Sequence, residues 1–293
     1  MEEKRCLIAG LPDAGKSTYL GALWYIINND PNKDKMSLKV SANNPPENLE
    51  QLSILSNRWL KVEDMDRTST DVPSNISFNL VTLSGGEDFT LEVPDFRGES
   101  IRQIITQNQP KEFDVWCERA DAMLYMMSNI APGLFADDYQ TDEDEIETEE
   151  NKVVGLEFDV KNMSAAAQNM LVLRYLAEKK QYKKVVICLS AWDKVMAYYP
   201  DKTPEEYVKE VSPALYNLIK FFYNNVKFYG LSAQGSEYEY EEFAGSDGQK
   251  QKRVTETCKK RLREATRKGE RAFVVVDKEK NADITIPIAE LLK

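Results

Sequence analysis

The sequence predicts an α/β fold in which a mostly parallel central sheet is covered by helices on both faces. Short apolar runs alternate with longer segments of helical periodicity over most of the 293 residues. The strongest apolar run, Lys184–Ser190, has the composition of a strand buried on both faces. Neither a repeat nor a linker divides the chain, so we expect one domain with insertions at about residues 32–73, 131–162 and 235–268.

In the first half of the chain, turn residues and changes of periodicity mark the ends of the elements. Residues 28–31 (Asn-Asn-Asp-Pro) end the first helix, and the turn at 84–88 joins two alternating segments into a hairpin. Residues 49–60 have the pattern of an amphipathic helix within an otherwise polar stretch. We expect strands at 5–9, 76–83, 89–93 and 121–128, and helices at 16–28 and 49–60.

The second half begins with an acidic run, because residues 137–150 contain nine acids and no base. Such a run is typical of a solvated insert. Beyond it, helical and apolar segments alternate again. We expect helices at 164–180, 204–223, 249–268 and near Pro287, and strands at 184–190, 226–231 and 272–276.

Composition excludes several classes of site. The chain has no histidine, which removes histidine-based triads, histidine-ligated zinc and imidazole acid–base catalysis. Its net charge of −11 argues against binding to nucleic acids or anionic membranes. The four cysteines form no CxxC pair, and no apolar stretch has the length of a membrane span or the position of a signal core. We therefore expect a cytoplasmic protein with reduced cysteines and no membrane insertion.

The turn after the first predicted strand matches the phosphate-binding pattern GxxxxGK[ST] at residues 10–17. Its glycines allow backbone N–H groups to approach phosphates, Lys16 supplies positive charge, and the Ser17 hydroxyl can bind Mg²⁺. The helix that follows presents its amino terminus to the anion. A strand precedes the loop and a helix follows it, so the sequence predicts a bound nucleotide. The expected contacts are Gly10, Asp13, Ala14, Gly15, Lys16, Ser17 and Thr18.

Two later strand ends carry residues suited to the rest of a nucleotide. Asp95 follows the second strand of the hairpin, where its carboxylate can hold Mg²⁺, and Gly98 can offer its backbone N–H to a γ-phosphate. Asp193 follows the buried strand at 184–190. One carboxylate accepts both N1–H and N2–H₂ of guanine, whereas adenine has no such pair of donors. The expected base contacts are Ser190, Trp192, Asp193, Ser232, Ala233 and Gln234.

These four stretches, in this order and at these strand ends, resemble the Ras-like (TRAFAC-class) P-loop GTPases. The resemblance implies a three-layer GTPase fold, GTP or GDP with Mg²⁺ as ligands, and hydrolysis to GDP and phosphate. The [NT]KxD motif is kept at Asp193 but changed at Ser190 and Ala191, and the missing lysine stem predicts modest guanine affinity. Residues 10–24 look most like the double-GTPase families of bacterial conflict and defence loci. That similarity implies a switch that works with an effector or a partner GTPase.

The resemblance also implies catalytic residues. Glu99 stands where many relatives carry the glutamine that orients the attacking water, and its negative charge faces the anionic phosphate, so we predict slow hydrolysis. Relatives carry a switch threonine that ligates Mg²⁺, and both Thr68 and Thr70 are candidates here. If Thr70 is the ligand, Arg67 has the spacing of the internal arginine of heterotrimeric G-protein α subunits. A surface arginine in a polar loop is the alternative.

Three functions remain to be compared. The first is a GTP-hydrolysing switch, and the second is a module that keeps a guanine nucleotide as a structural ligand, which Glu99 and the altered guanine motif favour. A kinase is the third, but no acceptor site accompanies the motifs. Residues 250–271 hold ten bases and three acids, so the helix at 249–268 is a candidate docking site for an acidic partner or RNA, although the lack of interleaved aromatic residues argues against single-strand binding. A plain solvated helix face, or pairing with the acidic run, explains the same charges.

Overall fold

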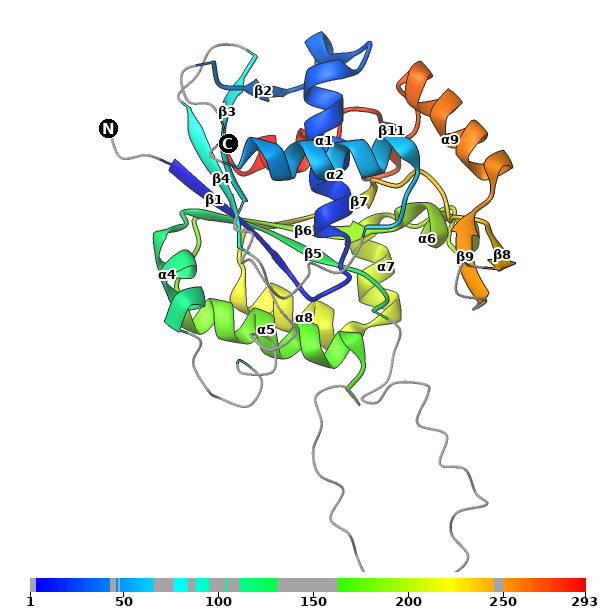
Figure 1. The fold of residues 1–293 in the computed structure, drawn as a ribbon. Coiled ribbons are helices and arrows are strands. Elements are labelled where there is room, and N and C mark those ends of the chain that lie inside the picture. The colour runs from blue at the N-terminus through cyan, green and yellow to red at the C-terminus, as the bar shows by residue number, and fades with distance from the viewer. Residues whose placement is uncertain are drawn as a thin grey trace, which may run out of the picture.

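The computed structural model describes residues 4–42, 46, 48–65, 76–83, 88–94, 104, 111–130, 163–244 and 250–293. Within them, one sheet has the strand order β11-β10-β7-β6-β5-β1-β4-β3-β2, and β8 pairs with β9 in a separate hairpin (Figure 1). The strands are β1 (Lys4–Gly10), β2 (Leu38–Val40), β3 (Ile76–Thr82), β4 (Phe89–Val93), β5 (Ala122–Met127), β6 (Lys184–Ser190), β7 (Val226–Ser232), β8 (Tyr240–Ala244), β9 (Lys250–Val254), β10 (Phe273–Val276) and β11 (Glu279–Asn281).

Helices lie on both faces of the sheet (Figure 1). One face is covered by α1, α2 and α10, and the other by α4, α5, α7 and α8. The helices are α1 (Lys16–Asn29), η1 (Lys33–Lys35), α2 (Leu49–Lys61), α4 (Lys111–Arg119), α5 (Ala165–Lys179), α6 (Trp192–Tyr198), α7 (Pro204–Val211), α8 (Pro213–Phe222), α9 (Glu256–Lys268) and α10 (Ile286–Glu290). No helix in these ranges is both long enough and apolar enough to cross a membrane.

The centre of the sheet is parallel. Strands β4, β1, β5, β6 and β7 run in the same direction, whereas β3 and β2 at one edge and β10 and β11 at the other pair antiparallel. The register aligns Gly10 with Met126 and Ser190 with Leu231. The loops after β1, β5, β6 and β7 therefore all leave the sheet at the carboxyl ends of the parallel strands, which is the edge where other parallel sheets bind ligands. The predicted α/β class with a mostly parallel sheet is confirmed.

Alternate side chains of the central strands fill two cores. On β1, Cys6 and Ile8 point into the core beneath α1, whereas Leu7 and Ala9 point into the core beneath α5, and all four are at most 2% exposed. This two-sided burial explains why the strand reads as a continuous apolar run. The four cysteines are free and buried. Burial raises the pKa of the Cys6 and Cys117 thiols to about 12, so neither is a thiolate nucleophile at neutral pH.

Two predicted helices have different bounds in the structure. The helix expected at 204–223 is two helices, because Pro213 cannot donate the backbone hydrogen bond that would continue α7. The helix expected at 249–268 begins only at Glu256, where the Thr255 hydroxyl caps it, and residues 250–254 form β9 instead. The acidic run at 137–150 lies outside the described residues.

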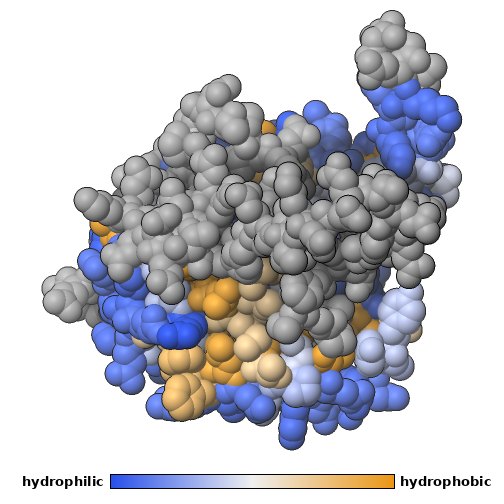
Figure 2. Space-filling view, turned by 90° about the horizontal axis from the view of Figure 1, so that it is seen from below, coloured by the Kyte–Doolittle hydropathy of each residue, from blue (hydrophilic) through white to orange (hydrophobic). Residues whose placement is uncertain are grey.

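The face covered by α4, α5 and α8 carries apolar side chains at its surface. Seen from below, apolar residues gather on part of this underside (Figure 2). Phe221 on α8 is 77% exposed, and Val115 on α4 is 49% exposed.

Candidate nucleotide-binding site

The loop between β1 and α1 is shaped by two glycines with positive φ. Gly10 has φ 151°, and a Cβ atom there would lie 2.2 Å from the carbonyl oxygen of Met126 on the neighbouring strand. Gly15 has φ 86°, and its Cβ position would lie 3.3 Å from Cβ of Ser190. Between them, the Ala14 N–H donates to the Leu11 carbonyl at 3.2 Å. The chain thus makes a tight, glycine-dependent turn next to the end of β6.

Lys16 lies across this turn. Its Nζ donates to the carbonyl oxygens of Gly10 at 2.8 Å and Leu11 at 2.7 Å. The ammonium is thereby held at the loop, where an anion bound by the backbone N–H groups would meet it. Two of its three donors are used in these bonds, and these can be exchanged for phosphate oxygens.

The first turn of α1 faces the same loop. Gly15 is its N-cap and has no side chain that could accept from the first backbone N–H groups, and the turn holds no acidic residue. These N–H groups and the positive end of the helix dipole favour an anion. Ser17 and Thr18 are half-buried in this turn, and the Asp13 carbonyl accepts from the Ser128 hydroxyl at 3.5 Å. The loop fits a polyphosphate.

A carboxylate, that of Asp193, follows the carboxyl end of β6. Asp193 lies in the first turn of α6, and its Oδ1 accepts from the Ser232 hydroxyl at 2.6 Å. The Ser232 oxygen in turn accepts from the Gly235 N–H at 3.2 Å, and Ser232 itself is fully buried. Asp193 is therefore anchored to the loop after β7. A carboxylate has about four acceptor positions, so it retains the capacity to accept two donors from a base.

The turn before Asp193 directs its neighbour inward. Ala191 adopts a left-handed conformation with φ 53°, and Trp192 is 1% exposed. The indole lies where a side chain on Gly230 would be, because a Cβ atom there would be 2.3 Å from the ring. Its other neighbour is Tyr207, with ring centroids 5.6 Å apart. The predicted base contact of Trp192 thus does not involve the indole, which belongs to the core.

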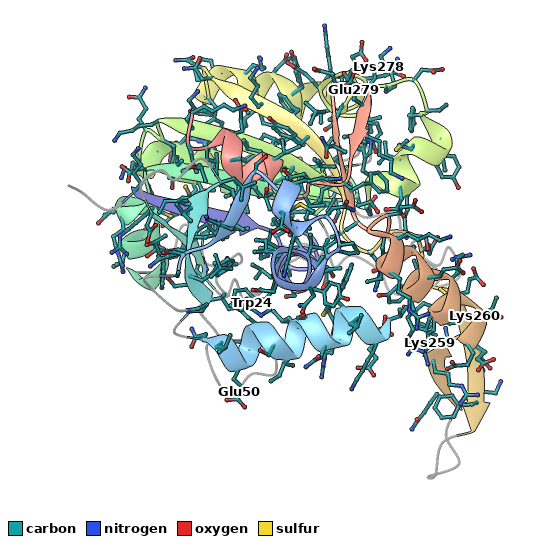
Figure 3. The ribbon with its side chains drawn as sticks, turned by 90° about the horizontal axis from the view of Figure 1, so that it is seen from above. Trp24, Glu50, Lys259, Lys260, Lys278 and Glu279 are labelled. Carbon is teal, nitrogen blue, oxygen red and sulfur yellow. The ribbon has the colours of Figure 1, made fainter. Side chains whose placement is uncertain are left out.

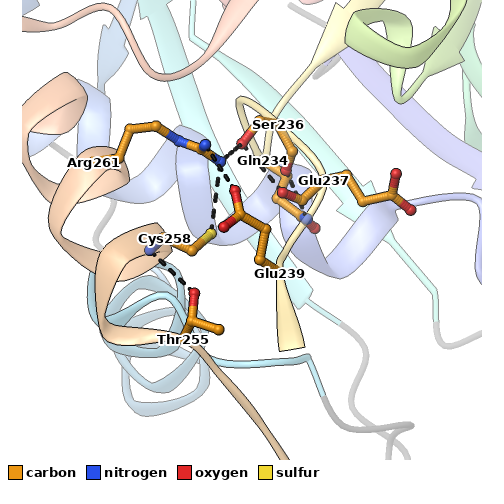
Figure 4. A network of polar contacts seen from close by, with 7 residues as sticks. All are labelled: Gln234, Ser236, Glu237, Glu239, Thr255, Cys258 and Arg261. Atoms are coloured by element: carbon orange, nitrogen blue, oxygen red, sulfur yellow. Dashed lines mark hydrogen bonds and ion pairs between the residues drawn. The ribbon is translucent and has the colours of Figure 1, made fainter. Parts of the chain in front are cut away.

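Two residues outside the predicted set hold the loop after β7. The Trp59 indole N–H donates to the Ala233 carbonyl at 2.8 Å, and the Arg271 Nε donates to the Gln234 carbonyl at 3.0 Å. The Gln234 side chain makes a bond within the same loop, since its Nε2 donates to the Ser236 carbonyl at 3.0 Å. Figure 4 shows this bond beside Arg261, which reaches from α9 to Ser236.

A family model, described as Double-GTPase 1, matches residues 7–291. The chain belongs to the Double-GTPase 1 family. The match covers the glycine-rich loop, Asp193 and the loop after β7, and it confirms the predicted resemblance to double-GTPase families. No curated protein matches the chain.

Solved structures similar to this Double-GTPase 1 chain include three nucleotide-binding proteins. One is a chain of the signal recognition particle receptor SRb-GTP/SRX complex from Chaetomium thermophilum, with 12% identity, TM-score 0.33, and coverage of 81% of this chain and 94% of that one. Another is the cytosolic domain of the T. maritima FeoB iron transporter in GMPPNP form. Its sequence identity is 12% and its TM-score 0.30, and the match covers 80% of this chain and 59% of that one. The third is Sup35 complexed with GDP. Its sequence identity is 15% and its TM-score 0.32, and the match covers 80% of this chain and 38% of that one. The family assignment depends on the family match and not on these likenesses.

Six predicted site residues of the Double-GTPase 1 chain lie outside the described residues. They are Arg67, Thr68, Thr70, Asp95, Gly98 and Glu99. Strand β4 runs parallel beside β1 and ends at Val93, so the chain leaves it at the same edge of the sheet as the phosphate loop. Of the predicted Mg²⁺ ligands, Ser17 is the one that the structure describes, and its hydroxyl belongs to the chemical class that Mg²⁺ binds.

Sequence reasoning missed Trp59 and Arg271. Trp59 lies on α2, within the insertion predicted at 32–73, and it is 174 residues from Ala233 in the sequence. Arg271 precedes β10 and was one base among ten in its stretch. No local motif marks either residue, because each meets the site through tertiary packing alone.

Proposed function

We propose that the chain binds GTP with Mg²⁺ and hydrolyses it slowly to GDP and phosphate, acting as a molecular switch. One observation carries the proposal: a turn suited to phosphates, with Lys16 held across it, shares a sheet edge with an anchored carboxylate suited to guanine. Gly15 and Ser190 are close neighbours between the two halves, because a Cβ atom added to Gly15 would lie 3.3 Å from Cβ of Ser190. Membership of a GTPase family supports the same chemistry.

In this proposal each residue has a defined task. Lys16 and the N–H groups of the first turn of α1 hold the β- and γ-phosphates and stabilise the charge that develops on them. Ser17, with Asp95 and either Thr68 or Thr70, would hold Mg²⁺. When bound, the ion neutralises phosphate charge. Gly98 contacts the γ-phosphate through its N–H. The attacking water lies in line with the leaving oxygen, and Glu99 accepts a hydrogen bond from it.

The identity of Glu99 is the basis for the slow rate. A carboxylate can orient water, but its charge is repelled by the phosphate, which raises the barrier. A second candidate, a guanine-nucleotide-binding interaction module without hydrolysis, is favoured by the same residue and by Ala191. Phosphate release under multiple-turnover conditions separates the two. Release beyond one equivalent supports the switch, whereas stable bound GTP with no release supports the module.

Arg67 is proposed to contribute to hydrolysis from within the chain. In GTPases a correctly placed arginine accelerates the reaction by about 10³–10⁵. Because Glu99 replaces the water-orienting glutamine, we expect a smaller effect, and Arg67→Ala should slow single-turnover GTP hydrolysis by at least about tenfold without changing GTP affinity. The measurement is single-turnover phosphate release at saturating protein. Equal rates in the variant and the parent chain would remove Arg67 from the mechanism.

We propose that an effector or partner GTPase binds through the switch segments near Thr70 and Glu99 or through the basic segment at 249–268, whose helical part is α9. The described part of this region is the arm formed by β8, β9 and α9, which projects from the side of the molecule and carries Lys259 and Lys260 (Figure 3). Many of its bases are already paired with acids of the same arm. The ion pairs are Lys250–Glu242, Arg253–Glu241, Lys259–Glu256, Arg261–Glu239 and Lys268–Glu264.

This pairing lowers the net positive charge that α9 presents. Among the described residues Lys260 and Arg267 form no ion pair, although both lie near enough to Glu264 to help lower the pKa of its carboxyl group, so these two bases are suitable probes of the arm. The double variant Lys260→Glu, Arg267→Glu should lose a partner that copurifies only with the GTP-loaded chain. If that partner is retained, the contact belongs to the switch segments. The four free, buried cysteines fit the reducing cytoplasm in which we propose that the protein acts.

A further inference from the structure

The guanidinium of Arg271 is buried, and its hydrogen-bond partners in the described part of the chain are all uncharged. Arg271 is 2% exposed, and its donors reach the Trp59 carbonyl at 2.6 Å, the Gln234 carbonyl at 3.0 Å and the Tyr238 hydroxyl at 3.2 Å. No acidic side chain contacts it among the residues that the structure describes. Burial lowers its pKa to about 10, so the group remains charged at neutral pH.

A buried charge is costly unless hydrogen bonds and favourable electrostatic contacts compensate for the lost water. Here the guanidinium lies 4.0 Å from the centroid of the Trp59 ring, and Trp59 is itself 1% exposed. The ring also packs against Tyr25 of α1, with centroids 5.3 Å apart. Arg271 and Trp59 thus form one packed unit that joins α1, α2 and the segment before β10.

This unit holds two successive peptide groups of the loop after β7. Trp59 holds the Ala233 carbonyl, and Arg271 holds the Gln234 carbonyl. In a planar trans peptide the carbonyl and the following N–H point in opposite directions. The Gln234 N–H therefore points away from Trp59. The Gly235 N–H likewise points away from Arg271, and it donates to Ser232, which in turn holds Asp193.

We propose that Trp59 and Arg271 are positioning residues for guanine recognition, because they fix the backbone of Ala233 and Gln234 beside Asp193. This inference rests on the proposed function. Neither residue is proposed to touch the nucleotide. Their effect is to keep one orientation of the loop populated before the base binds, which lowers the cost of ordering it on binding.

The test is Trp59→Phe, which keeps an aromatic ring beneath Arg271 and deletes the N–H that holds Ala233. Affinities for GDP and ADP are measured with Mg²⁺ well below the unfolding temperature. We expect the dissociation constant for GDP to rise on the order of tenfold, as for the loss of a partner by a buried carbonyl. The dissociation constant for ADP should not change, since adenine does not use Asp193. Arg271→Lys, which keeps the charge but cannot bridge both carbonyls, should change GDP affinity in the same direction.

Tyr223→Phe is the matched control. It also deletes a buried donor to a carbonyl, since the Tyr223 hydroxyl donates to Leu173 at 2.6 Å on the other side of the sheet. It should lower stability while leaving both affinities unchanged. If the parent chain prefers GDP and Trp59→Phe binds GDP equally well, the positioning role is wrong. If the parent chain shows no preference for GDP over ADP, the proposed function fails, and this inference fails with it.

Discussion

Replacing Lys16 by methionine should weaken GTP binding by about a hundredfold, or about 2.8 kcal/mol. Methionine retains much of the aliphatic stem but provides no charge and no donors for the β- and γ-phosphates. In the structure the ammonium donates to the backbone carbonyls of Gly10 and Leu11, so it is already held at the loop that would bind the phosphates. Equilibrium titration with a fluorescent GTP analogue measures the effect.

Lys180→Met is the control for this substitution. Its Nζ also donates to a backbone carbonyl, that of Glu118 at 2.8 Å, but it precedes β6 and so lies at the opposite edge of the sheet. The control should bind GTP as the parent chain does. If Lys16→Met and Lys180→Met bind GTP equally well, the loop after β1 is not the phosphate site.

The second large effect is expected from Asp193→Asn. Guanine presents two donors at N1 and C2, whereas xanthine carries a carbonyl oxygen at C2. Asparagine offers one acceptor and one donor group in place of two acceptors. The variant should therefore lose about tenfold or more in GTP affinity and gain affinity for XTP, so that its preference is reversed. Competition between GTP and XTP for the same site measures the ratio.

Asp114→Asn provides the comparison. Asp114 also accepts from a hydroxyl, that of Tyr175, and it pairs with Lys179 at 2.8 Å beneath the sheet. Its substitution should affect stability without changing the ratio of GTP to XTP binding. An unchanged ratio of GTP to XTP binding in Asp193→Asn would show that another group recognises the base. The proposed part of the loop after β7 in guanine recognition would then be wrong.

Elements with a strong local signal were predictable from sequence. Strand β6 has the predicted bounds because every one of its central residues is apolar, and α1 extends only one residue beyond its prediction. The hairpin of β3 and β4 was marked by alternation on both sides of a glycine-rich turn. The amphipathic pattern at 49–60 was confirmed as α2, although its place against α1 was not predictable.

Where prediction failed, short-range signals were weak or contradicted by a single residue. Pro213 divides a helical stretch, and β9 carries the charges of a solvated helix because both of its faces are largely exposed. At the site, the motif residues of the loop between β1 and α1 were predictable because binding a phosphate requires a particular residue type at each of these positions. Trp59 and Arg271 were not, since their roles depend on packing between segments far apart in the chain.

The most direct measurement is equilibrium binding of GTP, GDP and ATP to the full chain in the presence of Mg²⁺. The arrangement of Lys16, Asp193 and the loop after β7 predicts binding of both guanine nucleotides and discrimination against ATP. Preference for ATP, or no nucleotide binding by a folded sample, would contradict the assignment of Asp193 as the guanine-recognising residue and with it the proposed GTP switch.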